Sequence, residues 1–156
     1  MFVALVRPPA RPTGALAVSG HRVFGVTRHA VRAIAVELDG RRFSARRAEG
    51  GWDIDGRRAG GGTAQALDDL AGALAGLRAV DSFRGGDDSS YGLDHPRGSV
   101  QVTTPRGTRR VTIGDLNPGR AALYARREGD PRTLRIGLAF LNDLERVFFN
   151  RDGPRG

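Results

Sequence analysis

A serine, an aspartate and a histidine lie close together in the middle of this chain, and these are the residue types of a hydrolytic triad. The segment reads Ser89-Ser90-Tyr91-Gly92-Leu93-Asp94-His95-Pro96. In such a triad an aspartate orients a histidine, which takes the proton of the serine nucleophile. Adjacent residues of an extended segment point to opposite faces, so we expect that Asp94 does not orient His95.

The same segment has a simpler interpretation, in which each residue shapes the backbone. Gly92 can adopt a turn conformation that is closed to other residues, and Leu93 can enter the core. His95 precedes Pro96, and a residue before proline is driven to an extended conformation. We expect a corner between two elements, with no catalytic residue in it.

Metal chemistry would have to use histidines, because the chain has no cysteine. The histidines are His21, His29 and His95, and the first two have no helical frame around them. A zinc site would need at least one carboxylate from a distant part of the chain. We therefore predict no metal site and no cofactor. The absence of cysteine also excludes disulfides and thiol catalysis.

Two acidic pairs and a glycine run are the remaining residues that could carry chemistry. Asp68-Asp69 falls on the polar side of a predicted helix and Asp87-Asp88 in a glycine-rich loop, so neither pair gives the facing carboxylates of a glycosidase. Gly60-Gly61-Gly62 precedes a helix, but the Lys-Ser/Thr of a phosphate-binding loop is absent. We interpret these glycines as a flexible linker and predict that the protein is not an enzyme.

The net charge of +8 suggests a nucleic acid or an anionic membrane as a partner. All 25 basic residues are arginine, however, which is typical of a coding bias that also enriches alanine and glycine. The arginines are scattered along the predicted strands, as expected for the solvated face of a sheet. We therefore do not expect nucleic-acid binding.

Strand patterns begin at Val31. Residues 31–38 and 41–47 flank Asp39-Gly40, a strong signal for a hairpin, because both central residues of a type I′ turn need positive φ. Trp52 and Ile54 then alternate onto one face of a third strand. We expect Trp52 to be a core residue packed over the sheet, with stacking on a ligand as the alternative.

Two helices are predicted from apolar residues at helical spacing. Thr63 can cap a helix that ends at Leu77, and a second helix is expected over 138–148. Residues 79–83 lead out of the first helix, with Val80 and Phe83 expected to point inward. The strands expected between the helices cover residues 99–103, 108–113, 123–127 and 133–136.

These elements predict an α+β fold made of two similar halves. Each half is an antiparallel strand meander followed by one amphipathic helix, over about Val31 to Leu77 and about Ser99 to Phe148. The predicted domain covers residues 23–150, with halves at about 23–80 and 81–150. Residues 151–156 are expected to form a disordered tail.

The first 22 residues are interpreted as an apolar stub and a proline-rich tether. Met1 to Val6 is apolar, but it is too short for a membrane-spanning helix, which needs about 20 apolar residues, or for a signal peptide. Arg7 to Gly14 contains three prolines and is expected to be extended. A truncated membrane anchor and a disordered start of a soluble protein are both consistent with this pattern.

The order of motifs resembles the bacterial domain-of-unknown-function family numbered forty-three forty. The resemblance covers the chain from about Val23 to Phe148, and Tyr-Gly-Leu-Asp-x-Pro is its most specific part. The chain is short for the family, and the family's N-terminal membrane helix is absent or reduced to Met1 to Val6. The motif residues, which we expect to be structural, are Trp52, Tyr91, Gly92, Leu93, Asp94, Pro96, Gly114 and Tyr124.

The resemblance implies an envelope protein with an extracytoplasmic domain, often encoded beside gliding-motility-type ABC transporter components. It implies envelope or transporter subunits as partners. It also implies a location on the extracytoplasmic, periplasmic face of the inner membrane, with the cytoplasm as the alternative if no anchor precedes Met1. The family brings no established catalytic residues.

Two hypotheses of function remain. The first is a non-catalytic extracytoplasmic protein-interaction domain, accessory to an ABC-type envelope transporter. The second is a small ligand-binding or hydrolytic module that uses the cleft between the two halves. The second hypothesis predicts a pocket that collects Tyr91, Asp94, His95 and Tyr124.

Overall fold

The computed structural model describes residues 22–119 and 121–153. It is an α+β fold with a nine-stranded sheet in the order β4-β3-β2-β1-β6-β7-β8-β9-β5, in which every neighbouring pair is antiparallel. The α+β prediction is confirmed. The strands are β1 (Ala33–Leu38), β2 (Arg41–Ala48), β3 (Gly51–Ile54), β4 (Arg57–Arg58), β5 (Ala79–Phe83), β6 (Gly98–Thr104), β7 (Gly107–Leu116), β8 (Ala122–Arg127) and β9 (Thr133–Gly137).

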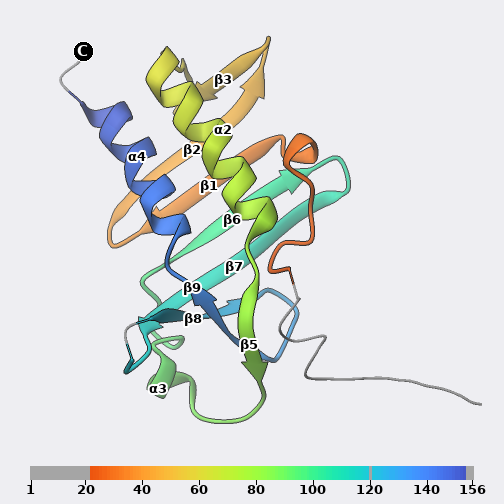
Figure 1. Cartoon of the computed structure of the whole chain (residues 1–156), viewed down its shortest axis with the longest axis vertical. Coiled ribbons are helices and arrows are strands. Elements are labelled where there is room, and N and C mark those ends of the chain that lie inside the picture. The colour runs from red at the N-terminus through yellow and green to blue at the C-terminus, as the bar shows by residue number, and fades with distance from the viewer. Residues whose placement is uncertain (1–21, 120, 154–156) are drawn as a thin grey trace, which may run out of the picture.

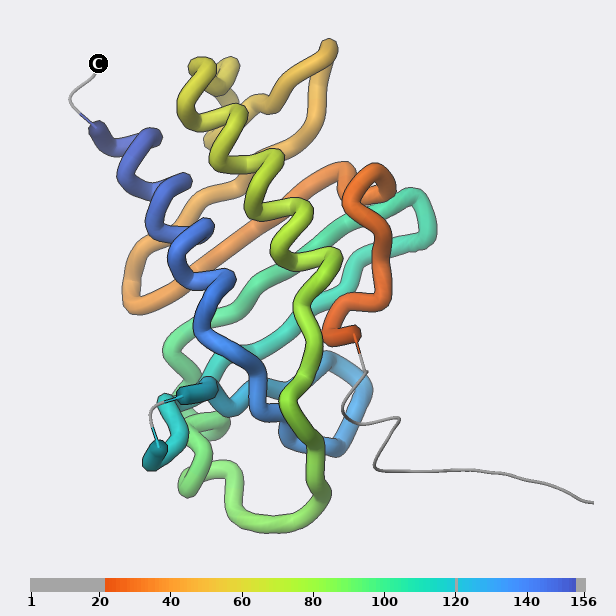
Figure 2. Tube along the Cα trace, in the orientation of Figure 1, coloured from red at the N-terminus to blue at the C-terminus, as the bar shows by residue number. Residues whose placement is uncertain are grey.

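Two long helices form a layer on one face of the sheet. They are α2 (Gly61–Gly76) and α4 (Phe140–Asp152), which run antiparallel to each other and side by side (Figures 1 and 2). A short helix α3 (Asp88–Tyr91) and a 3-10 turn η1 (Arg28–Ala30) lie outside this layer. No helix of the described residues is long and apolar enough to cross a membrane.

The core lies between the two long helices and the sheet. Buried residues alternate with more exposed ones along β1, β3 and β6, because successive side chains of a strand point to opposite faces. On β1, for example, Ile34, Val36 and Leu38 are buried. They meet the buried faces of the helices, which include Leu67, Leu70, Ala71 and Leu74 of α2 and Phe140, Leu144, Val147 and Phe148 of α4.

The opposite face of the sheet is not covered by α2 or α4, and we call it the open face. Side chains that alternate with the buried ones define it, and most of them are polar. They are Ala33, Ala35 and Glu37 on β1, Arg42, Ser44 and Arg46 on β2, Ser99, Gln101 and Thr103 on β6, and Thr108, Arg110 and Thr112 on β7. The helix-bearing side is called the covered face.

The hairpin between β1 and β2 turns at the predicted residues. Asp39 and Gly40 have φ values of 53° and 83°, so both central residues have the positive φ that a type I′ turn requires. A second hairpin, between β3 and β4, was not predicted. Its turn at Asp55-Gly56 has φ values of 50° and 82°, and an Asp-Gly pair in the sequence could have revealed it.

Both long helices differ from their predicted bounds. Gly61 and Gly62 form the first turn of α2 instead of a linker, and the amide of Ala64 donates to the carbonyl of Gly60. Helix α4 continues past Phe148 to Asp152. Residues 151 and 152 are therefore helical, contrary to the predicted tail, and residues 154–156 lie outside the described residues.

The segment after α2 forms strand β5, which the sequence analysis treated only as an exit from the helix. It crosses to the far edge of the sheet and pairs with β9. Val80 is 60% exposed and does not point inward, because the register shifts between Ala79 and Asp81. Most of the predicted N-terminal stub and tether, residues 1–21, lies outside the described residues, whereas Arg22 forms a bridge with Arg78.

Candidate functional site

The Tyr91 segment begins with a short helix where a loop was predicted. Asp87 precedes α3 as its N-cap, and its carboxylate accepts hydrogen bonds from the amide and the hydroxyl of Ser89. Gly92 ends the helix with a φ of 72°, a left-handed conformation that glycine adopts without strain. The segment is therefore held at both ends by local hydrogen bonding and backbone geometry.

This corner packs on β7 through a very close contact at Gly114. A Cβ atom at Gly114 would lie 2.3 Å from the carbonyl oxygen of Tyr91, so no larger residue fits without displacing the corner. Leu93 lies beside the same glycine. It is half-buried there and does not belong to the main core, which the sequence had suggested for it.

Three aromatic rings anchor the corner to the end of the sheet. Tyr91 lies 5.2 Å from Phe83 and 4.7 Å from Tyr124, measured between ring centroids. Edge-on and tilted contacts of this kind are favourable for aromatic pairs. Arg126 of β8 adds an ion pair with Asp88, and its guanidinium keeps the pKa of that carboxyl below its usual value. The corner is thus a packed joint between α3 and strands β5, β7 and β8.

The side chains of Asp94 and His95 lie closer to each other than the sequence predicts. The Nδ1 atom of His95 is 3.2 Å from a carboxylate oxygen of Asp94. The expectation of opposite faces is wrong because both residues lie in a bend, where side chains do not alternate as they do in an extended strand. The His95 side chain is 93% exposed, and Ser89 bonds to Asp87 instead of joining it.

Within residues 22–119 and 121–153, no three His, Asp or Glu side chains are placed to hold a metal ion. His29 and His95 are both exposed, and His21 lies outside the described residues.

Trp52 lies buried under α2, and its indole nitrogen has a hydrogen-bond partner. The indole nitrogen donates to Asp68 of α2 at 2.9 Å, and the guanidinium of Arg47 lies 4.5 Å from the ring centroid. The ring is 1% exposed, so no face of it is free for a ligand. Asp68, one of the acidic residues of the sequence analysis, thus joins α2 to the sheet.

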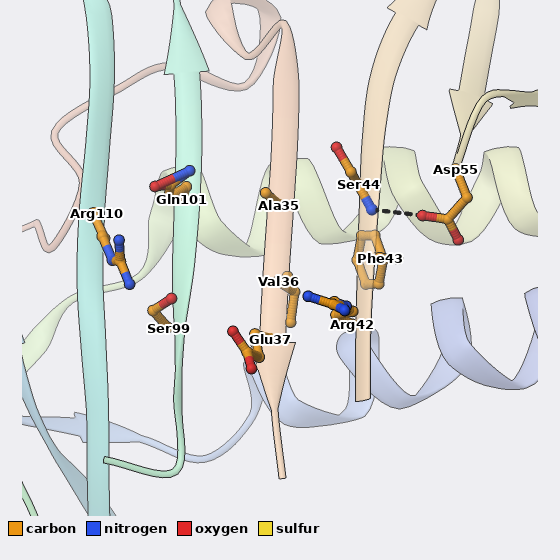
Figure 3. A pocket seen from close by; sticks show the side chains of 10 residues that line it. All are labelled: Ala35, Val36, Glu37, Arg42, Phe43, Ser44, Asp55, Ser99, Gln101 and Arg110. Carbon is orange, nitrogen blue, oxygen red and sulfur yellow. Dashed lines mark hydrogen bonds between the residues drawn. The ribbon is translucent and has the colours of Figure 1, made fainter. Parts of the chain in front are cut away.

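A shallow hollow lies in the middle of the open face and is the candidate site of this fold. It has a volume of about 340 Å³ and extends across β2, β1, β6 and β7 (Figure 3). Polar side chains dominate its lining, and the Val36 and Phe43 side chains point away from it into the core. Its lining residues are Ala35, Val36, Glu37, Arg42, Phe43, Ser44, Asp55, Ser99, Gln101 and Arg110.

The strand register sets the arrangement of groups in the hollow. Ala35 lies directly between Ser44 of β2 and Gln101 of β6, and Gln101 in turn pairs with Arg110 of β7. In the next row Glu37 lies between Arg42 and Ser99. The floor is therefore small and hydrogen-bonding, with an arginine on each side and one carboxylate off centre (Figure 3).

The Arg-Arg pairs of β2 and β7 divide between the two faces of the sheet. Arg41, Arg47 and Arg109 point to the covered side, and each has a partner: Arg41 pairs with Glu145, Arg47 with Asp68, and Arg109 donates to the Phe24 carbonyl. Their sequence neighbours Arg42, Arg46 and Arg110 point to the open side. These three guanidinium groups form no ion pair with any described residue.

The residues that look reactive in the sequence predict a pocket at the Tyr91 corner and not this hollow. None of Tyr91, Asp94, His95 and Tyr124 lines the hollow. The sequence feature related to the hollow is the alternation of polar residues along the predicted strands. This alternation identifies the exposed face of each strand, but it does not show which strands pair. The central pairing of β1 with β6 joins residues far apart in the sequence, so the hollow exists only in the folded sheet.

The arrangement can form hydrogen bonds and ion pairs with a ligand laid across the strands. Asp55 at its margin is already engaged, because it accepts from the Ser44 amide and pairs with Arg151. Glu37 has no ion-pair partner among the described residues. The groups of the hollow that have no side-chain partner in the described part of the chain are therefore two arginines, one carboxylate and the side chains of Ser44, Ser99 and Gln101.

Comparisons with known proteins identify the family of the chain. No curated protein and no solved structure has significant similarity to it. The family model described as Domain of unknown function (DUF4340) matches residues 52–150, from Trp52 through the Tyr91 corner to α4. This match covers more than half of the 156-residue chain, so the protein belongs to the DUF4340 family, as the sequence motifs predicted.

Proposed function

We propose that this protein is a non-catalytic extracytoplasmic protein-interaction domain, accessory to an ABC-type envelope transporter. The observation that carries the proposal is the open face of the sheet. Four adjacent strands expose polar side chains there, with a shallow hollow at the centre and, around it, guanidinium groups that form no ion pair with a described residue. A broad face of this kind suits the docking of another protein.

The envelope location and the transporter partner come from the family resemblance. Members of the family resemble envelope proteins encoded beside gliding-motility-type ABC transporter components. A domain on the periplasmic side of the inner membrane would meet the extracytoplasmic parts of such a transporter. The residues that give the family its motifs maintain the fold in this proposal, and the open face contacts the partner.

We also propose that the domain consists of two similar halves. Strands β1–β4 precede α2 and strands β6–β9 precede α4, and both helices lie on the same face of the sheet (Figure 1). The central pairing of β1 with β6 would be the joint between the halves. Strand β5 departs from this scheme, because it follows α2 yet extends the sheet beside β9.

Site-specific photo-crosslinking of the full chain in its native host tests the interaction. A photoreactive residue replaces Gln101 on the open face, and Gln65, an exposed glutamine on α2, provides the matched control. We expect position 101 to crosslink to a subunit of an envelope transporter and position 65 not to do so. Crosslinking only to cytoplasmic proteins, or to no transporter subunit at either position, would overturn the proposal.

A further inference from the structure

We propose that the centre of the open face binds an acidic segment of a partner protein, with carboxylates over Arg42 and Arg110 and a basic or amide side chain over Glu37. The inference deepens the proposed function and rests on it. It names the surface that docks and the chemistry that the surface recognises.

The Arg-Arg pairs of β2 and β7 leave one set of guanidinium groups available to a partner. On the covered side, Arg41 and Arg47 hold carboxylates of the helices. On the open side, Arg42, Arg46 and Arg110 form no ion pair with any residue that the structure describes. Guanidinium groups recognise carboxylates by paired hydrogen bonds, so these three remain available to a partner.

The spacing of the strands sets the length of a segment that could cross the hollow. Arg42 lies on β2 and Arg110 on β7, with β1 and β6 between them. Three strand spacings of about 4.8 Å each separate the two backbones by about 14 Å. An extended segment rises about 3.3 Å per residue, so roughly four to five residues would cross the hollow. Ser44, Ser99 and Gln101 offer hydrogen bonds along that path.

Glu37 makes the surface selective and disfavours a nucleic acid. It projects from β1 between Arg42 and Ser99, so the charges across the hollow alternate in sign (Figure 3). A phosphate backbone carries only negative charge and would be repelled by this carboxylate. The one aromatic residue of the lining, Phe43, is 2% exposed with its ring in the core, so it cannot stack on a base.

A second copy of this chain is a poor occupant. Its net charge is +8, so two copies repel each other. Its acidic pairs are also largely engaged, since Asp68 bonds to Arg47, Asp69 to Arg146 and Asp88 to Arg126. A different protein with a free acidic segment complements the open face better.

Fluorescence anisotropy of labelled peptides on the purified protein tests the inference. One decapeptide, the Glu-Lys-Glu peptide, carries two glutamates about four residues apart with a lysine between them, to match the spacing of the two arginines. A second carries glutamate in place of that lysine, and a single-stranded DNA of about ten nucleotides is the third probe. The variant Arg42→Glu/Arg110→Glu reverses the two charges. The control Arg57→Glu/Arg84→Glu changes the net charge equally, at two exposed arginines without ion pairs in the described part of the chain, away from the hollow.

We expect the Glu-Lys-Glu peptide to bind most tightly to the wild-type protein. Arg42→Glu/Arg110→Glu should weaken that binding about tenfold, and the control should weaken it less than about twofold, because its charges do not contact the peptide. Glu37→Lys should reverse the preference, so that the peptide with glutamate at all three positions binds more tightly. Thermal unfolding of each variant confirms that it is folded.

Three outcomes would overturn the inference. Equal weakening in the two double variants would show that only net charge matters. Tighter binding of the DNA, with dependence on Arg42 and Arg110, would identify a nucleic acid as the occupant. Failure of both peptides to bind folded protein would exclude the acidic segment. If the Arg42→Glu/Arg110→Glu variant still crosslinks to the transporter from position 101, the proposed interaction function stands. The proposed recognition of an acidic segment is then wrong.

Discussion

The covered and open faces of the sheet use the same strands in different ways. On β2, Phe43 points to the covered face, is 2% exposed and packs edge-on against Phe148 of α4 at 5.2 Å. Its neighbours Arg42 and Ser44 point to the open face and line the hollow. The covered face therefore carries the packed core, and we expect substitutions in the centre of the open face to leave the fold intact.

Neighbouring arginines of β2 show the same difference between the two faces. Because the residue type is the same, the difference in their contacts comes from the face to which each side chain points. Arg47 donates to the Val31 carbonyl at 2.7 Å, pairs with Asp68 and lies over the Trp52 ring. Arg46, the preceding residue, has no ion-pair partner among the described residues. A guanidinium group on the covered side holds elements together, whereas one in the centre of the open side does not.

The largest expected effect is on the covered face. Phe43→Ala removes a buried ring and should lower the free energy of unfolding by about 3–5 kcal/mol. Ser44→Ala, at the next position of the same strand, should change it by less than about 0.5 kcal/mol, because Ser44 bonds to the described residues through its backbone and not through its hydroxyl. Urea denaturation measures both values, and equal effects would contradict the division into faces.

The fold was predictable from sequence where local rules decide it. The alternation on β1 and β2, the turn at Asp39-Gly40 and the apolar stripe of α2 all arise from residues close in the chain. The crossing of β5 to the edge beside β9 could not be predicted, since its pairing depends on strands that come much later. Propensity also failed for Gly61 and Gly62, which are helical because α2 packs against α4 in the folded domain.

The candidate site was less predictable than the fold. The residues that looked reactive, Asp94 and His95, lie together in a bend, and the His95 side chain is almost fully exposed. The hollow is built from residues that looked ordinary, such as Ser44, Ser99 and Gln101. They become neighbours only through the pairing of β1 with β6, a contact that one sequence does not reveal.

The second expected effect concerns the end of the open face, where α3 does cover the sheet. Gly114→Ala would place a Cβ atom 2.3 Å from the Tyr91 carbonyl oxygen, so it should lower the free energy of unfolding by about 1–3 kcal/mol. Gly137→Ala, which meets nothing within 4 Å, is the matched control and should have little effect. Near-ultraviolet circular dichroism should report altered Tyr91 and Tyr124 packing in Gly114→Ala alone. Unchanged spectra and stability would contradict the close contact.

A smaller loss of stability is expected at Arg47 of β2, and the neighbouring residue Arg46 provides the control. Arg47→Ala removes the bonds to Val31 and Asp68 and the contact with Trp52, which should cost about 1–2 kcal/mol of unfolding free energy. Arg46→Ala should cost less than about 0.5 kcal/mol. Chemical denaturation with tryptophan fluorescence follows both variants, because Trp52 is the one tryptophan of the chain. A larger cost for Arg46→Ala would show that the open face is structurally engaged.

The smallest expected effect depends on pH and concerns Asp130, whose carboxylate accepts hydrogen bonds from two arginines. The side chain of Arg132 donates to Asp130, with a further bond from Arg127, and these bonds hold the pKa of that carboxyl well below its usual value. A lowered folded-state pKa stabilises the fold above the unfolded-state pKa of about 3.9, and this stability is lost as the pH falls further.

Asp130→Asn should therefore lower the free energy of unfolding by about 1 kcal/mol at pH 7. The difference from the wild-type protein should shrink progressively below about pH 4, because the wild-type carboxyl then becomes protonated and loses its charge-assisted bonds. Glu37→Gln on the open face should match the wild-type stability at pH 7, since Glu37 forms no ion pair with a described residue. Urea denaturation at pH 7 and at pH steps below 4 separates the two carboxylates. A constant deficit for Asp130→Asn at every pH would mean that its charge contributes nothing, and a deficit for Glu37→Gln would mean that the open face contributes to folding.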